Sequence, residues 1–124
     1  MVEINKKILI VEDSKSYLWV LSQALMAAGF ILATAGNGEE GLESAKKENP
    51  DLILLDITMP KMDGITMSQK VKEAGIKSPI IFLTNMSDMN HINDAMATST
   101  DYMVKADVSV EDIVARVKDK LNIK

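Results

Sequence analysis

Five short apolar runs rich in β-branched residues recur along the chain, with room for a helix between each pair. The runs are KILIVE (7–12), FILATA (30–35), DLILLD (51–56), PIIFLT (79–84) and the weaker DYMVK (101–105). The segments between them carry apolar residues at helical spacing, and this alternation predicts βα units with a parallel sheet. The stretches 8–11 and 52–55 are apolar throughout, as expected for strands covered by helices on both faces. An α/β chain of the (βα)5 type, with five strands and five helices, accounts for all 124 residues.

The helix boundaries follow from capping residues. The predicted N-caps are Ser14, Asn37 with Glu40 three positions later, and Ser109 with Asp112. The predicted helix ends are Gly29, Asn49-Pro50 and Gly75.

The first predicted helix has an apolar face and two apolar residues that lie off it. At about 100° per residue, one side of this helix collects Tyr17, Leu18, Leu21, Ala24, Leu25 and Ala28. Trp19 and Met26 then point away from the core. Two interpretations stay open: isolated surface apolar residues, which are common, or a docking surface for a partner.

Composition and charge narrow the class of protein. A chain of 124 residues, 47% hydrophobic and 26% charged, predicts a single globular domain over 1–124 with no output domain. The net charge is −4 and the lysines are scattered, which argues against direct nucleic-acid binding. The absence of cysteine excludes disulfides and cysteine nucleophiles. No apolar run approaches the roughly 18 residues of a membrane span, so we expect no membrane insertion and a cytoplasmic location.

Carboxylates follow two of the predicted strands. Glu12 and Asp13 end the first strand, and Asp56 ends the third. In an open parallel sheet the binding crevice lies at the carboxyl ends of the strands, so these acids converge if the two strands are neighbours. An all-oxygen cluster suits Mg²⁺, and an ionised aspartate beside it is a candidate nucleophile for a phosphoryl group. The alternative is that such acids are solvated or cap the next helix.

The fourth and fifth predicted strands end on residues that suit a phosphate. Thr84 supplies a hydroxyl and Lys105 an ammonium at the same edge of the sheet. Both can bind the oxygens of a phosphoryl group on Asp56. The alternative of solvated acids does not explain why the other strand ends carry matching chemistry.

Together these residues resemble a known family. Glu12-Asp13, Asp56 within DITMPKMDG, Thr84 and Lys105 are similar to the signature set of response-regulator receiver domains of two-component signalling, from about residue 7 to 121. The chain is similar to stand-alone receivers of the chemotaxis-regulator type. The resemblance implies a flavodoxin-like, doubly wound sheet of five parallel strands in the order 2-1-3-4-5.

The resemblance also implies the metal site and the phosphorylation site. Asp56 would accept a phosphoryl group from a histidine kinase or phosphotransfer protein, giving an aspartyl phosphate. Asp13, Asp56 and the backbone carbonyl of Thr58 would bind Mg²⁺ directly, and Glu12 would act through a metal-bound water. The chain would be a phospho-acceptor with self-phosphorylation and self-dephosphorylation only, and not an enzyme in any other sense.

The implied output is a change of surface. Thr84 and Lys105 would bind the phosphoryl oxygens, and Tyr102 would move inward as Thr84 shifts. A downstream effector protein would read the face made by the fourth helix, fifth strand and fifth helix, which includes Asn90, His91, Asp94 and Tyr102. The first helix, with Trp19 and Met26, would dock the phosphodonor. His91, the only histidine, is either a solvated residue or a carrier or ligand.

Three positions depart from the commonest family pattern. Asn85 stands where a very small residue is usual, and Ala106 where a proline with a cis peptide is common. Met86 stands where fast-hydrolysing members have a polar residue that helps to orient the attacking water. Thr58, at the other position that modulates the rate of hydrolysis, offers only a hydroxyl. We therefore predict slow self-dephosphorylation.

Two rival functions stay open. A Mg²⁺-dependent phosphatase with an aspartyl-phosphate intermediate usually has a second aspartate two residues after the nucleophile, where this chain has Thr58. An unphosphorylated pseudo-receiver would serve only as an interaction module. Chemotaxis, phosphorelay and transcriptional control through a partner would all suit a receiver.

Overall fold

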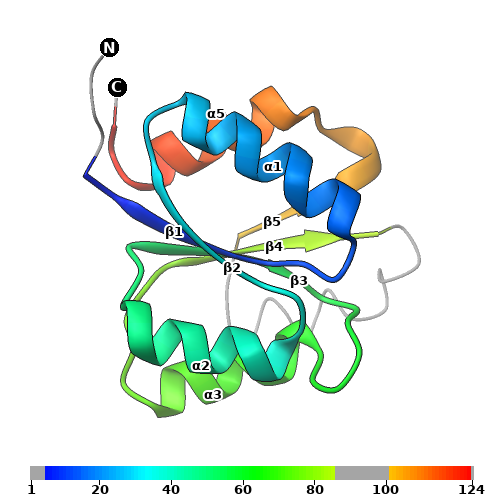
Figure 1. The fold of residues 1–124 in the computed structure, drawn as a ribbon, viewed down its shortest axis with the longest axis vertical. Helices are drawn as coiled ribbons and strands as arrows, with labels where there is room; N and C mark the ends of the chain where they lie inside the picture. Colours follow the sequence, from blue (N-terminus) through cyan, green and yellow to red (C-terminus); the bar gives the residue numbers. More distant parts are fainter. Residues whose placement is uncertain (1–4, 86–100, 124) are drawn as a thin grey trace.

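A single sheet of parallel strands forms the centre of the computed structural model, which describes residues 5–85 and 101–123 (Figure 1). The strands are β1 (Lys7–Val11), β2 (Ile31–Ala35), β3 (Leu52–Asp56), β4 (Ile80–Thr84) and β5 (Tyr102–Val104). Their order is β2-β1-β3-β4-β5 and every pairing is parallel. The predicted order and strand direction are therefore confirmed.

Helices cover both faces of the sheet. They are α1 (Lys15–Ala27), α2 (Gly38–Glu48), α3 (Gly64–Glu73) and α5 (Val110–Lys120), with a short 3-10 helix, η2 (Lys105–Asp107). α1 and α5 lie on one face, and α2 and α3 on the other (Figure 1). The fourth predicted helix falls outside the described residues. No helix within the described ranges is long and apolar enough to cross a membrane.

The core consists of two layers because neighbouring residues of a strand point to opposite faces. Leu9 and Val11 of β1 belong to a cluster that includes buried residues of α2 and α3. Ile8 and Ile10 belong to a second cluster with buried residues of α1 and α5. β1 and β3 are almost fully buried, as their unbroken apolar runs predicted.

The predicted helix starts are confirmed. The Ser14 hydroxyl accepts a hydrogen bond from Tyr17 N at 3.4 Å. Ser109 and Asp112 form a complete capping box at the start of α5. At the start of α2, the Asn37 side chain accepts a hydrogen bond from the backbone N–H of Glu40. The Glu40 carboxylate accepts one in return from the side-chain amide of Asn37, and not from its backbone N–H as in a capping box.

The predicted helix ends are confirmed as well. Gly29 and Gly75 have φ angles of 101° and 81°. Asn49, with a φ of 46°, is the left-handed C-cap of α2 and precedes Pro50. These left-handed residues end the helices before the next strands begin.

Several strand boundaries differ from the prediction by one residue, and two of them concern site residues. Glu12 was expected to end the first strand, but β1 stops at Val11. Lys105 was expected to end the fifth strand, but β5 stops at Val104 and Lys105 begins η2. The chain turns into a 3-10 helix there, so Lys105 lies one position beyond the sheet and still at its carboxyl edge. Every described peptide bond is trans, including the one between Lys105 and Ala106.

Candidate functional site

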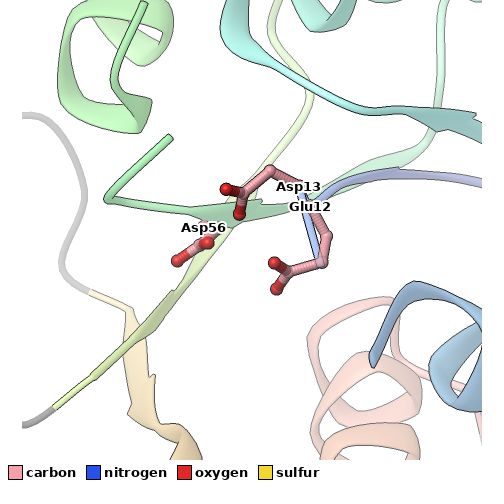
Figure 2. Close-up of side chains that lie close together, drawn as sticks. All are labelled: Glu12, Asp13 and Asp56. Atoms are coloured by element: carbon pink, nitrogen blue, oxygen red, sulfur yellow. The ribbon is translucent and has the colours of Figure 1, made fainter. Parts of the chain in front are cut away.

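Three carboxylates meet where β1 and β3 end. Val11 of β1 pairs with Leu55 of β3, so the residues that follow them, Glu12 and Asp56, lie side by side. Asp13 comes next in the turn to α1. One carboxylate oxygen from each of Glu12, Asp13 and Asp56 lies within 4.8 Å of the others, and Figure 2 shows the three side chains close together at the carboxyl ends of β1 and β3. The predicted acidic cluster is therefore present.

The Asp56 carboxylate is buried beside like charges. Asp56 is 2% exposed and Glu12 is 1% exposed, whereas Asp13 is exposed. Burial raises the pKa of Asp56 from its ordinary value of 3.8 to about 7, and the carboxylates of Glu12 and Asp13 add to the rise while Lys105 opposes it. The site therefore carries a negative charge that the fold stabilises poorly.

The ligand atoms of this cluster fit a hard divalent cation. Within residues 5–85 and 101–123, Asp56 Oδ1 is buried and has no hydrogen-bond partner. Buried polar atoms are nearly always paired in folded proteins, and a carboxylate oxygen left open beside two further acids is suited to a cation that prefers oxygen ligands. The acidic group can thus hold a metal ion.

Lys105 is the cation that approaches this cluster. Its Nζ lies 2.6 Å from Glu12 Oε1 and 3.5 Å from Asp56 Oδ2. Burial alone would lower the pKa of Lys105, but the hydrogen bond to Glu12 and the charge of Asp56 raise it above its ordinary value. Lys105 therefore stays protonated at the mouth of the site.

Glu12 is fixed through both of its oxygens. Oε1 accepts from Lys105, and Oε2 accepts from the backbone N–H of Ser14 at 3.0 Å. These two hydrogen bonds fix the orientation of the Glu12 carboxylate. This arrangement agrees with a role for Glu12 outside the direct ligand set.

Thr84 and Lys105 reach the same edge through successive strand pairs. Asp56 pairs with Leu83 on β4, which places Thr84 one position beyond it, and Thr84 pairs with Val104 on β5 just before Lys105. Thr84 is fully buried, and its hydroxyl donates to the carbonyl of Asn85 at 3.0 Å. The predicted hydroxyl and ammonium therefore lie at the edge that carries Asp56.

The loop after Asp56 is built around a close backbone approach. Thr58 is exposed, and the N–H of Gly64 donates to the carbonyl of Ile57 at 2.8 Å. A Cβ at Gly64 would overlap the carbonyl oxygen of Asp56. Asp63 accepts a hydrogen bond from Thr66 N at 2.8 Å and is the N-cap of α3.

Some of the residues predicted to dock partners lie within the described ranges and others lie outside them. Trp19 and Met26 are 65% and 50% exposed on α1, so the prediction that they point away from the core is confirmed. Ile31, at 45% exposure on the edge strand β2, is a further exposed apolar residue that the helix pattern did not reveal. Tyr102 is half-buried on β5 and packs against the cluster beneath α2 and α3. Met86, Asn90, His91 and Asp94 lie outside the described residues.

Sequence reasoning missed one residue of the site. Tyr17 was assigned to the core face of α1, and it does pack against the core, but its ring also faces Lys105, with Nζ 4.6 Å from the ring centroid. Burial raises the pKa of the Tyr17 hydroxyl, and the carboxylates of Glu12 and Asp56 add to this while Lys105 opposes it. The available signal was its position four residues after Asp13, within the first turn of α1.

Comparison with protein families gives one match that spans most of the chain. The response regulator receiver domain family matches residues 8–118. This range includes all the strand-end residues described above.

Individual relatives agree with this match. The alkaline phosphatase synthesis transcriptional regulatory protein PhoP of Bacillus subtilis (strain 168) is 37% identical over 115 residues, which are 92% of this chain and 48% of that protein. The probable transcriptional regulator ycf27 of Cyanophora paradoxa is 39% identical over 122 residues, 96% of this chain and 50% of that protein. The chain thus spans about half the length of the curated relatives that it matches.

Solved structures share the fold. A CheY-like response regulator receiver domain protein from Methanospirillum hungatei JF-1 superposes with a TM-score of 0.88 at 28% identity, over 96% of this chain and 95% of that one.

Proposed function

The chain belongs to the response regulator receiver domain family, whose members are phospho-acceptor signalling domains, and from this premise we propose that Asp56 is its phosphorylation site. One observation carries the proposal. Asp56 is a buried carboxylate at a strand end, with an open oxygen, two further acids within 4.8 Å and the Lys105 ammonium at 3.5 Å. No other described acid combines these properties.

The proposed reaction transfers a phosphoryl group from a phosphohistidine donor. A carboxylate oxygen of Asp56 forms the new bond to phosphorus as the donor's P–N bond breaks, and the electron pair of that bond stays on the imidazole nitrogen. Asp56 must be ionised to attack, which its pKa of about 7 allows for a large fraction of molecules at neutral pH. Lys105 neutralises the charge of the transferring group.

The acidic cluster is the proposed Mg²⁺ site. Asp13, Asp56 and the backbone carbonyl of Thr58 would hold the ion, and Glu12 would act through a bound water. Bound Mg²⁺ would supply charge neutralisation for the phosphoryl group. The two hydrogen bonds that fix Glu12 support its indirect role, because neither oxygen is open in the way that Asp56 Oδ1 is.

Phosphorylation would then act as a switch. It adds about one negative charge and strong acceptor oxygens to Asp56, and Thr84 and Lys105 would bind that form better than the unmodified one. Tyr102 would follow Thr84 and alter the surface around β5; Asn90, His91 and Asp94, which the family resemblance adds to this surface, lie outside the described residues. An effector protein would read this surface.

The partners are proposed from the family and from the exposed residues. A histidine kinase or phosphotransfer protein would dock on α1, where Trp19 and Met26 are exposed. The curated relatives are transcriptional regulators, but they are about twice as long as this chain, so DNA binding is not assigned to it. A cytoplasmic location belongs to the same proposal, and the stand-alone, chemotaxis-type organisation stays a prediction.

Intact mass after incubation with phosphoramidate or acetyl phosphate and Mg²⁺ tests the proposal. The wild type should gain one phosphoryl group, and Asp56→Asn should gain none. Asp63→Asn is the matched control, because Asp63 is an exposed acid of the same loop and asparagine is also a good N-cap. Asp63→Asn should react like the wild type, and EDTA should slow the reaction in both.

A variant at Asn85 separates a blocked site from an inactive one. Asn85 is larger than the usual family residue and could restrict access to Asp56. If neither the wild type nor Asn85→Ala gains mass, the proposal is wrong and the unphosphorylated interaction module is favoured. Sustained turnover of a phosphomonoester would instead favour the phosphatase. The decay of the mass gain measures the phosphorylated lifetime, which we predict to be long from Thr58 and Met86.

A further inference from the structure

Tyr17 presents the face of its ring to the Lys105 ammonium. Nζ lies 4.6 Å from the ring centroid, well within the distance at which a cation is attracted to an aromatic face. The ring is half-buried and packs against the core cluster beneath α1 and α5. Packing therefore fixes the ring, and the ring can fix the ammonium.

Lys105 is surrounded by three groups of different character. Lys105 Nζ lies 2.6 Å from a carboxylate oxygen of Glu12 and 3.5 Å from one of Asp56. It lies 4.6 Å from the centroid of the Tyr17 ring. A lysine side chain has many rotamers and a strongly hydrated head, so holding it in one place has an entropic cost. The lysine side chain is nevertheless only 16% exposed.

The three groups differ in what they do when a phosphoryl group arrives. Glu12 is an anion and competes with the phosphoryl oxygens for Lys105. The Tyr17 ring carries no net charge and competes with nothing. The ammonium can therefore exchange a carboxylate for a phosphoryl oxygen while it stays against the ring.

We propose that Tyr17 is a positioning residue, whose ring face holds the Lys105 ammonium between Glu12 and Asp56. The consequence for phosphorylation rests on the proposed function, whereas the placement of Lys105 does not. The part played by the ring is separable from that of the hydroxyl, because Tyr17→Phe keeps the first and removes the second.

The placement is tested without phosphorylation. A ring at this distance shifts the ε-methylene protons of Lys105 upfield, and the signal is assigned by its loss in Lys105→Arg. In ¹H–¹³C spectra of lysine-labelled protein, the upfield shift should persist in Tyr17→Phe and disappear in Tyr17→Leu. An unchanged Lys105 signal in Tyr17→Leu would overturn the proposal.

The consequence is tested with phosphoramidate and Mg²⁺. The phosphorylation rate of Tyr17→Leu should fall about two- to thirtyfold, which corresponds to about 0.5–2 kcal/mol of cation–π energy at 1.4 kcal/mol per tenfold. Tyr17→Phe should stay within about twofold of the wild type. Gln23→Ala, an exposed change on the same helix, should leave the rate unchanged. Tyr17→Met replaces Tyr17→Leu if thermal melts show the latter to be unfolded.

The outcomes separate this proposal from the one it rests on. If neither the wild type nor Asn85→Ala gains a phosphoryl group, this counts against Asp56 as the acceptor, and the Lys105 signal still decides where the ammonium is held. Wild-type rates in Tyr17→Leu would overturn the positioning role. Equal losses in Tyr17→Leu and Tyr17→Phe would assign the effect to the hydroxyl and overturn the role of the ring face.

Discussion

A lysine–glutamate pair lies at each end of β1, and the two pairs differ in their surroundings. At the amino end, Lys7 Nζ lies 2.9 Å from Glu48, and both side chains are 31% exposed. At the carboxyl end, Lys105 lies 2.6 Å from Glu12, and the side chains are 16% and 1% exposed. Two pairs of the same residue types therefore differ in setting: Lys7–Glu48 is a surface contact, and Lys105–Glu12 is part of a buried cluster.

The pKa values of the acids at the two ends are shifted in opposite directions by their surroundings. The hydrogen bond from Lys7 and its charge lower the pKa of Glu48. Burial and the nearby Glu12 raise the pKa of Asp56 to about 7. Charges at the amino end support the folded chain, whereas those at the carboxyl end make it costlier to fold and leave it ready for a cation or phosphoryl group.

The largest expected effect is on stability without Mg²⁺. Asp56→Asn should raise the free energy of unfolding at about pH 8 by up to about 4 kcal/mol, because the wild type must keep an acid ionised whose pKa rises from 3.8 to about 7 on folding. Asp51→Ala, at the amino end, should lower it by about 0.5–1.5 kcal/mol, since this change removes the oxygen that accepts a hydrogen bond from Lys7 N at 2.8 Å. Urea unfolding in EDTA measures both.

The pH dependence gives the sign of this effect. Because the folded-state pKa of Asp56 is the higher one, its contribution favours the folded state below pH 3.8 and is lost as the pH rises through about 7. The gain from Asp56→Asn should therefore be greatest above pH 7 and shrink toward pH 4. A gain that does not change with pH, or a loss of stability in Asp56→Asn, would contradict the comparison of the two ends.

Bound Mg²⁺ should offset the free energy that the folded chain loses by keeping Asp56 ionised, and it should have no such effect at the amino end of β1. Its affinity should rise about tenfold per pH unit up to about pH 7 and level off above it, because Asp56 must lose its proton to bind the ion. At a hundred times the dissociation constant, the ion should stabilise the wild type by about 2.7 kcal/mol. Calorimetric titration across pH measures this. Asp13→Asn should weaken binding and Asp63→Asn should not, and an affinity independent of pH would rule out Asp56 as a ligand.

The smallest expected effect compares the two lysines. Lys105→Met leaves Glu12 and Asp56 without their cation and should lower the free energy of unfolding at neutral pH by about 1–3 kcal/mol. Lys7→Met should have little effect, which should fade further in high salt, because exposed pairs contribute little and are screened. Thermal melts of both variants in low and high salt compare them. Equal losses from the two variants would mean that burial does not distinguish the pairs.

Much of the fold could be predicted because it depends on neighbours in sequence. The apolar runs determine β1 and β3, and Ser14, Ser109 and Gly75 mark helix boundaries through short-range hydrogen bonds and backbone angles. The acids of the site were also predictable, because residues at the carboxyl ends of parallel strands meet at one edge.

The contacts of Lys105 could not be predicted in the same way. Its hydrogen bond to Glu12 joins residues 93 positions apart. Whether Lys105 faces Glu12, the ring of Tyr17 or solvent depends on how the turn into η2 approaches the start of α1. Periodicity along the chain carries no information on that approach, so Tyr17 was assigned to the core and its second contact was missed.

Gly64 limits how this site can change over evolution. The residue has no space for a side chain because of the carbonyl of Asp56, while Thr58 in the same loop is exposed. If Asp56 is the proposed acceptor, substitutions at Thr58 would change the lifetime of its phosphorylated form and leave Asp56 in place, whereas any side chain at Gly64 would displace the backbone of Asp56 itself. The loop therefore combines a position open to variation with one that is closed to it, and under the proposed function the duration of the signal would be free to diverge while the chemistry at Asp56 is kept.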